Sequence, residues 1–431
     1  MPSMPLRRGP TLFLTVVLLA FGSAWASESS RDPLPRAQPE EVGMSSERLA
    51  RLTAGLKRYT DEGKVAGSVA LVARRGKLVY LEAFGDRDRE AHARMRTDSI
   101  FRIASQTKAV VVTGAMMLVE QGKLLLTDPV AKYFPEFGST TVAVPKDGGG
   151  YDVVPAKRPI TIRDLMTHTS GIGYGMGVAA DQWKKAGIQG WYFADRNEPI
   201  AATVSRMAAL PFDAQPREKW VYGYNIDILG AIIEKVAGMP LDEYMRTAVT
   251  GPLGMSDTAF YLPKEKRDRL TVVYSMNGKP QLERAPAPGG MIGQGAYVDG
   301  PRKSFSGGAG FLSTAGDYAR FLQMILNGGQ LDGKRLLSRK TVELMTTDHL
   351  GDVPFQPGVG IGLGFSVVTN VGERGEPGSV GEYGWGGAYH STYWVDPREQ
   401  LIVVYLTQLI PAGDIDDFGK LRSLVYAAIV D

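Results

Sequence analysis

The chain contains no cysteine and only four histidines among its 431 residues. Without cysteine it can form neither a disulfide nor a thiolate metal site, and no lipid can be attached through an N-terminal cysteine. The histidines, His92, His168, His349 and His390, are widely scattered and include neither a close pair nor a His-Glu-x-x-His motif. We therefore expect no zinc site and no other cofactor.

Other absences narrow the class of enzyme. Lys and Arg number 49 against 46 Asp and Glu, and no long basic run with interleaved aromatic residues is present, so nucleic acid is not an expected partner. The glycine-rich stretches match neither a phosphate-binding loop nor a dinucleotide fingerprint. The sequence also lacks the Gly-x-Ser-x-Gly elbow, which disfavours a standard α/β-hydrolase.

The N-terminal segment differs in composition from the rest of the chain. Arg7 and Arg8 precede an apolar stretch at 11–21, and Ala24-Trp25-Ala26 has the small-x-small form of a cleavage site. This pattern predicts a secretory signal peptide over residues 1–26. The apolar stretch is short for a membrane span, although an uncleaved anchor is the alternative. We expect an exported protein, periplasmic or secreted, with no stable membrane span after cleavage.

Strands are predicted near both ends of the chain, with helices between them. A helix is expected from Ser46 to about Gly63, followed by a hairpin of two β-rich runs at 65–73 and 77–84. Later strands are expected at 307–311, 363–369, 391–395 and 401–406. Further helical segments are expected at 128–134, 162–166, 200–210, 227–236, 315–327 and 421–430.

This order of elements predicts an α+β fold, an α/β sandwich in which an antiparallel sheet is flanked by helices. The length of the chain allows two lobes. We expect residues 27–110 and 300–431 to form the sheet lobe. Residues 111–299 are expected to form an all-helical second lobe.

The segment Ser105-Gln106-Thr107-Lys108 places a hydroxyl and an amine on one face of a predicted helix that ends at Gly122. At a helix N-terminus, the N–H of Ser105 could stabilise an oxyanion, and a neutral Lys108 could take the hydroxyl proton. The alternative is structural, because serine is a favoured N-cap residue and lysine in a first turn is usually solvated.

Two aromatic segments that contain glycine lie far downstream. Trp220-Val221-Tyr222-Gly223-Tyr224-Asn225 leads into an apolar helix, and Tyr383-Gly384-Trp385-Gly386-Gly387-Ala388 precedes a predicted strand. Glycines beside a strand often allow a ligand or another backbone to approach closely. Aromatic packing at a helix entry and a simple turn are the structural alternatives.

Together these three segments resemble the serine β-lactamase and penicillin-binding-protein superfamily, and within it the branch of class C β-lactamases and family VIII carboxylesterases. The resemblance extends from Gly43-Met44-Ser45 to the end of the chain. It implies a β-lactamase/transpeptidase-like fold in which Ser105 is acylated, Lys108 is its base partner, and Tyr222 is a second base that protonates the leaving group. It also implies an oxyanion hole formed by the N–H groups of Ser105 and Ala388.

The sequence departs from the β-lactamase pattern at two motifs. The Tyr-x-Asn motif is broken, because Tyr224 occupies its third position and Asn225 falls one residue late. The Lys-Thr-Gly motif is replaced by Trp385-Gly386-Gly387, which removes the cation that would pair with a β-lactam carboxylate. These five residues are candidates for substrate binding. Other cations that could bind a carboxylate are Arg158, Arg217 and Arg302.

The sequence therefore predicts an exported serine hydrolase that cleaves carboxylic esters through an acyl-enzyme on Ser105. A small-molecule ester or amide is the expected substrate. A β-lactamase or D-amino-acid peptidase is the first alternative, and a non-catalytic binding protein of the same fold is the second. His168 is expected to hold a turn through hydrogen bonds rather than to act in catalysis.

Overall fold

The computed structural model describes residues 1–5, 32–276 and 281–431. The chain divides into two units, Met1–Arg31 and Asp32–Asp431. Apart from Met1–Pro5, the predicted signal peptide lies outside the described residues. Among the described residues, no helix has the length and apolar composition needed to cross a membrane.

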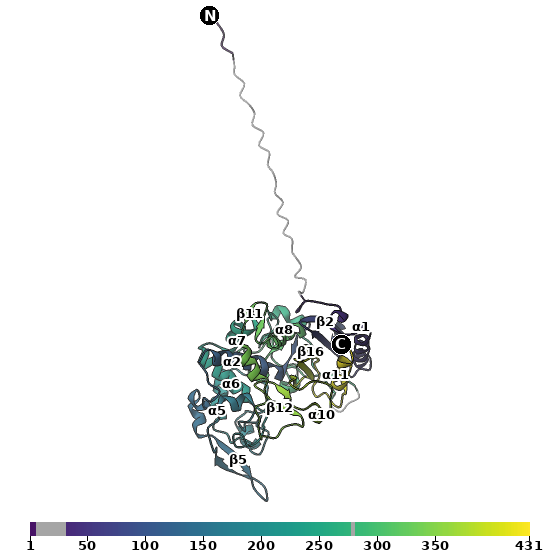
Figure 1. Ribbon diagram of the computed structural model, residues 1–431. Coiled ribbons are helices and arrows are strands. Elements are labelled where there is room, and N and C mark those ends of the chain that lie inside the picture. Colours follow the sequence, from purple (N-terminus) through teal and green to yellow (C-terminus); the bar gives the residue numbers. More distant parts are fainter. Residues whose placement is uncertain (6–31, 277–280) are drawn as a thin grey trace. The chain divides into compact units, whose positions relative to one another are not determined.

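An eight-stranded antiparallel sheet forms the core of the second unit (Figure 1). Its strand order is β12-β13-β14-β15-β16-β1-β2-β3, and Val69 in the first long strand pairs with Leu406 near the C-terminus. This arrangement confirms the prediction of one antiparallel sheet built from distant parts of the chain. The strands are β1 (Gly67–Arg74), β2 (Lys77–Asp88), β3 (Ala93–Arg94), β12 (Val359–Ile361), β13 (Ser366–Val368), β14 (Tyr383–Gly387), β15 (Ser391–Asp396) and β16 (Leu401–Leu406).

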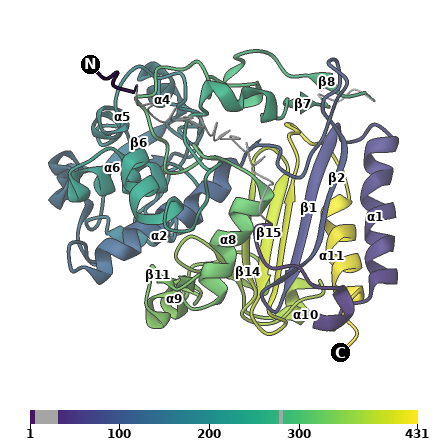
Figure 2. The same cartoon turned by 90° about the horizontal axis from the view of Figure 1, so that it is seen from above.

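Helices cover both faces of this sheet, and β1 is buried along its whole length as a result. On one face α1 (Ser46–Asp61) and α11 (Asp417–Ala427) pack side by side, as Figure 2 shows. Here Leu52 and Leu56 of α1 join Ala70 and Val72 of β1 in one apolar cluster. The alternate residues of β1 face the other cluster, which includes α8 (Ala315–Leu326). Because successive side chains of a strand point to opposite faces of the sheet, β1 contributes residues to both apolar clusters.

Most of the remaining helices come between β3 and β12 in the sequence. The central one, α2 (Thr107–Glu120), is apolar on nearly all sides and buried over most of its length. The others are α3 (Ile162–Met166), α4 (Ala180–Lys185), α5 (Ile200–Met207), α6 (Asn225–Ala237), α7 (Leu241–Met245), α9 (Arg339–Met345) and α10 (Val371–Arg374). A π-helix spans Arg246–Thr250. Short 3-10 helices occupy Pro39–Val42, Ala104–Gln106, Val130–Lys132, Pro135–Ser139, Lys264–Arg269 and Gly290–Ile292.

The middle of the chain is not all helical, which corrects the sequence prediction. β5 (Thr141–Pro145) and β6 (Tyr151–Pro155) form a hairpin that projects from the rest of this unit in Figure 1. Gly148, Gly149 and Gly150 have positive φ and form its turn. Glycine adopts this conformation readily, so this run forms the tip of the hairpin. Other short pairs are β7 (Tyr274–Ser275) with β8 (Glu283–Arg284), β10 (Gln330–Leu331) with β11 (Lys334–Arg335), and β4 (Phe101–Arg102) with β9 (Leu312–Ser313).

The predicted strand at 307–311 is wrong, because this segment forms a turn. A Cβ atom on Gly307 would lie 2.3 Å from the carbonyl oxygen of Ile226, and one on Gly308 would lie 2.4 Å from the Asp227 carboxylate. The glycines thus serve close packing of the turn against α6. The other predicted helices and strands are present, although several boundaries differ, and 128–134 contains only a short 3-10 helix.

Candidate active site

Ser105 lies in a tight turn between β4 and α2. The chain leaves β4, forms the 3-10 helix Ala104–Gln106, and enters α2 at Thr107. Ala104 is buried with a φ of 42°, a backbone conformation that is rare for a residue with a side chain. Strained residues of this kind cluster at functional sites, where the surrounding structure maintains them. The turn leaves the Ser105 side chain partly exposed, at the edge of a groove.

Lys108 lies one helical turn beyond Ser105 and is 3% exposed. Its Nζ atom is 3.1 Å from Ser105 Oγ, 2.8 Å from the carbonyl oxygen of Gly308 and 3.3 Å from the hydroxyl of Tyr174. A neutral amine has two N–H donors and one lone pair. Donation to Gly308 and Tyr174 would use both N–H groups and leave the lone pair for the Ser105 proton. The contacts therefore suit a lysine that acts as a general base.

Tyr222 presents the face of its aromatic ring to the amine of Lys108. Lys108 Nζ is 4.5 Å from the ring centroid. The Tyr222 hydroxyl accepts a hydrogen bond from Trp385 Nε1 at 3.1 Å, so the tryptophan of the altered motif holds the tyrosine. Trp220 stacks on the same ring at 5.4 Å between centroids. The structure thus brings Ser105, Lys108, Tyr222 and Trp385 together.

Tyr174 is a site residue that the sequence reasoning missed. Its hydroxyl is within hydrogen-bond distance of Lys108, and its ring meets that of Tyr222 edge to face at 5.7 Å. Burial, together with the neighbouring Tyr222, raises the pKa of Tyr174 well above its ordinary value. Tyr174 therefore remains an uncharged phenol at neutral pH. Its local signal is a tyrosine between two glycines, Gly173-Tyr174-Gly175, which many ordinary loops share.

Tyr224 and Asn225 do not reach the groove. Tyr224 is fully buried between Trp183 and Phe193, and its ring stacks on that of Trp183 at 5.7 Å between centroids. Asn225 begins α6 and is also fully buried. Its amide donates to the carbonyl oxygen of Ile172, and its oxygen accepts from Ser170. Both residues thus hold the entry to α6 instead of facing a substrate.

His168 supports this inner layer of the site. Its Nδ1 lies 3.0 Å from the amide nitrogen of Asn225, which must act as the donor, so that the ring proton is on Nε2. Burial and the charge of Lys108 lower the pKa of His168 well below its ordinary value. The neutral ring packs against Tyr222 with centroids 4.7 Å apart. His168 has a φ of 56°, as expected of a residue in a tight turn.

A groove of about 1070 Å³ opens beside Ser105. Ser105 and Ala388, the expected oxyanion-hole residues, both line it, together with Gly384, Trp385, Gly386 and Gly387 of β14. A Cβ atom on Gly387 would lie 2.5 Å from the carbonyl oxygen of Ile103, so glycine lets β14 approach the serine turn. The aromatic side chains in the lining are Tyr174, Trp191, Trp220, Tyr222, Phe355, Trp385, Tyr393, Trp394 and Phe418.

The arginines of the groove are already paired. Arg374 and Arg422 line it, and each forms a 2.7 Å ion pair with the buried carboxylate of Glu382. The other cations considered from sequence are not among the lining residues. Arg158 pairs with Asp164, while Arg217 and Arg302 donate to the carbonyl oxygens of Leu350 and Leu262. Within the described part of the chain, no group of acidic or histidine side chains could hold a metal ion.

Comparison with known proteins shows a family. The sequence matches the family model described as Beta-lactamase over residues 49–423. It is 33% identical over 396 residues to esterase EstB of Burkholderia gladioli, with 88% of this chain and 95% of that protein covered. It is 26% identical over 426 residues to a protein of Escherichia coli K12 named "Putative D-alanyl-D-alanine carboxypeptidase", with 92% of each covered. The structure of EstCE1, a hydrolase with promiscuous acyltransferase activity, has a TM-score of 0.75 and 27% identity, with 88% of this chain and 98% of that chain covered.

Proposed function

The chain belongs to the β-lactamase family and is a serine hydrolase, and from that premise we propose that it cleaves neutral carboxylic esters through an acyl-enzyme on Ser105. The observation that carries this proposal is the contact set of Lys108. This buried amine lies 3.1 Å from Ser105 Oγ. In its neutral form it has two N–H groups, and the Tyr174 hydroxyl and the Gly308 carbonyl oxygen can accept from them.

In the proposed first half-reaction, Ser105 Oγ attacks the ester carbonyl and Lys108 Nζ takes the hydroxyl proton. The negative charge that develops on the carbonyl oxygen is stabilised by the N–H groups of Ser105 and Ala388. Collapse of this intermediate breaks the bond to the alcohol oxygen. The departing oxygen takes a proton through Tyr222, whose ring lies against Lys108. Water then repeats the sequence on the acyl-enzyme and releases the acid.

The groove favours an uncharged substrate for two reasons. Trp385 occupies the place of the lysine that would bind a carboxylate, and the lining Arg374 and Arg422 are paired with Glu382 and Glu376. An anionic substrate would lose water without gaining a charged partner, which is costly. Aromatic surface from Trp220, Phe355 and Trp385 offers apolar contact instead.

A D-amino-acid peptidase or β-lactamase is the second candidate. It is favoured by the 26% identity to the Escherichia coli protein over nearly its whole length. The same serine and lysine would serve amide cleavage, so the candidates differ in how the groove binds substrate.

The test is a side-by-side assay of the purified protein on a short-chain aryl ester and a chromogenic cephalosporin, with intact-mass analysis of quenched reactions. We expect a higher kcat/KM for the ester and a mass increase equal to the acyl group. A ratio of ester to cephalosporin kcat/KM below one would instead support the second candidate.

We also propose that residues 1–26 direct export, from the order of the arginine pair, apolar stretch and small-x-small site. The test compares cell fractions that express the full chain or a variant without residues 2–26. Export requires that the full chain leave the cytoplasm, shortened at Ala26, while the variant stays inside. Equal distribution of the two would refute the proposal.

A further inference from the structure

Asp227 is a buried carboxylate in the first turn of α6 that the proposed mechanism does not use. Its Oδ1 atom accepts hydrogen bonds from the Ser306 hydroxyl at 2.5 Å and from the N–H of Gly308 at 3.1 Å. Its Oδ2 atom is buried and has no hydrogen-bond partner within the described residues. Burial raises the pKa of Asp227, while the Ser306 hydrogen bond and the charge of Lys108 oppose this rise.

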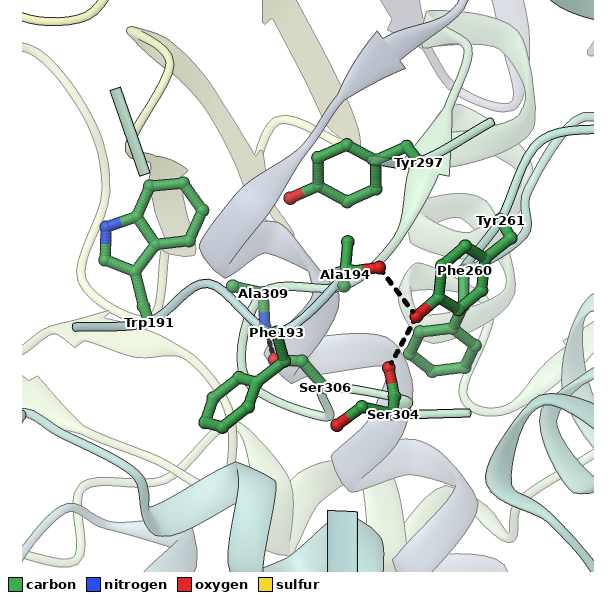
Figure 3. A pocket seen from close by; sticks show the side chains of 10 residues that line it. Trp191, Phe193, Ala194, Phe260, Tyr261, Tyr297, Ser304, Ser306 and Ala309 are labelled. Carbon is green, nitrogen blue, oxygen red and sulfur yellow. Dashed lines mark hydrogen bonds between the residues drawn. The ribbon is translucent and has the colours of Figure 1, made fainter. Parts of the chain in front are cut away.

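The two donors to Asp227 belong to one short turn, residues 306–310. Figure 3 shows its Ser306 hydroxyl beside the N–H of Ala309, from which it accepts a hydrogen bond at 3.0 Å. The turn also lies close against the backbone of α6, since no side chain fits on Gly307 or Gly308. Its position is therefore fixed by α6, both through close packing against the helix and through hydrogen bonds to the carboxylate of Asp227.

The same turn provides the shortest hydrogen bond of Lys108. The carbonyl oxygen of Gly308 accepts from Lys108 Nζ at 2.8 Å, while its N–H is bound to Asp227. One residue thus connects the carboxylate and the amine. A displacement of this turn would move the acceptor that orients the Lys108 lone pair towards Ser105.

The titratable groups that face Lys108 come from three segments. Tyr174 and Tyr222 contact it from two loops, and His168 and Asp227 act on it electrostatically. The low pKa of His168 and the high pKa of Tyr174 keep these two side chains uncharged near neutral pH. Asp227 is a carboxyl group that can place a negative charge near the amine.

We propose that Asp227 is a positioning residue for Lys108. Through the turn at Gly308 it fixes the carbonyl group that orients the amine, and its negative charge acts on the pH dependence of the reaction at Ser105. This inference rests on the proposed function, since it requires Ser105 to be the nucleophile and Lys108 its base.

The first test measures how fast a fluorophosphonate labels Ser105 as a function of pH in the wild type, Asp227→Asn and Glu234→Gln. An asparagine oxygen can still accept from Ser306 and Gly308, but the negative charge is lost. Removal of a negative charge beside a basic group should lower the midpoint of the pH profile of labelling, on the order of one pH unit. Glu234→Gln makes the same change on the same helix, away from the turn, and should match the wild type.

The second test separates the position of the turn from charge. Asp227→Ala removes both hydrogen bonds, and labelling at the optimal pH should fall roughly ten- to a hundredfold. Ser306→Ala keeps the charge but loosens the turn, so the rate should fall without a lower midpoint. Ser304→Ala is the matched control, because its buried hydroxyl has no partner among the described residues and also appears in Figure 3.

The outcomes separate a failure of the proposed function from a failure of the role of Asp227. An unlabelled wild type would refute the proposed function. A labelled wild type with an unchanged midpoint in Asp227→Asn would refute the charge role of Asp227 alone. If Asp227→Asn does not fold, the comparison of Ser306→Ala with Ser304→Ala decides the positioning role, and equal rates in these two variants would overturn it.

Discussion

The side chains on the two sides of the groove are held in place by different kinds of interaction. On the Lys108 side, hydrogen bonds of 2.8 to 3.3 Å connect Ser105, Gly308 and Tyr174 to one buried amine. On the Trp385 side, aromatic rings pack at centroid distances of 4.8 to 6.3 Å, and one hydrogen bond connects Trp385 with Tyr222. Hydrogen bonds fix direction, whereas ring packing tolerates small shifts. We expect the first side to control turnover and the second to control which substrate binds.

The largest effect is expected on the Lys108 side from Ser105→Ala. Loss of the nucleophile should lower ester turnover by about 10⁶, the cost of breaking a catalytic unit. The measurement is kcat on a short-chain aryl ester, with the melting temperature as a check on folding. Ser304→Ala serves as the control. Retention of more than about a tenth of wild-type activity would contradict the assignment of Ser105.

Substitution of either tyrosine next to Lys108 should lower kcat less than Ser105→Ala does. Tyr222→Phe removes only the hydroxyl that passes a proton to the leaving group, and kcat should fall about 10²- to 10⁴-fold. Tyr174→Phe removes a hydrogen bond to Lys108, worth roughly 1 kcal/mol or about fivefold in rate. Because Tyr174 stays an uncharged phenol, this variant should keep the alkaline part of the pH profile. A larger loss in Tyr174→Phe than in Tyr222→Phe would exchange their roles.

On the aromatic side, Trp385 carries both an apolar surface and the hydrogen bond to Tyr222. Trp385→Phe keeps the surface but removes the N–H donor, so kcat should fall moderately while KM for neutral esters changes little. Trp385→Lys should favour carboxylate substrates by roughly 1.5 to 3 kcal/mol, the value of a charge-assisted hydrogen bond. The measurement is the ratio of kcat/KM for a neutral ester to that for a cephalosporin. An unchanged ratio in Trp385→Lys would show that this position does not select charge.

The smallest effect is expected from Phe355→Ala at the outer part of the aromatic side. Phe355 packs on Trp220 at 4.8 Å between centroids and is partly exposed. Its loss should raise KM for bulky aromatic esters several-fold, on the order of 1 kcal/mol, and leave kcat for a small ester unchanged. A fall in kcat for both esters would show that the two sides of the groove are not separable.

Patterns that act over short distances predicted much of this arrangement from the sequence. The alternation in β1, the helix start at Ser105 and the spacing to Lys108 are local, and the structure contains all three. Tyr174 was not predicted, because its role depends on a contact with Lys108, from which it is separated by 66 residues in the sequence. Neither its residue type nor its glycine neighbours indicate that contact.

The displaced Asn225 shows a second limit of sequence reasoning. A one-residue shift at a helix entry moves a side chain by about 100° around the helix axis. Asn225 lies among buried partners, including Ser170 and His168, and Tyr224 at the motif position is buried as well. A residue type close to a motif position says little until the direction of its side chain is known. The turn at Gly307 and Gly308 gave a similar error, because its glycines reflect packing against α6.

The pairing of β1 with β16 determines when this protein can begin to work. Val69 pairs with Leu406, so the central strand pair forms only after Leu406 has been synthesised, more than 300 residues after Val69. Contacts between such distant residues slow folding and lengthen the time spent incompletely folded. Ser105 emerges early, but β14 and Ala388, which line the groove with it, come from the last part of the chain. A nascent chain, or one shortened before Ala388, would therefore carry the serine without a completed site, and activity would begin only after β14 and Ala388 have been synthesised.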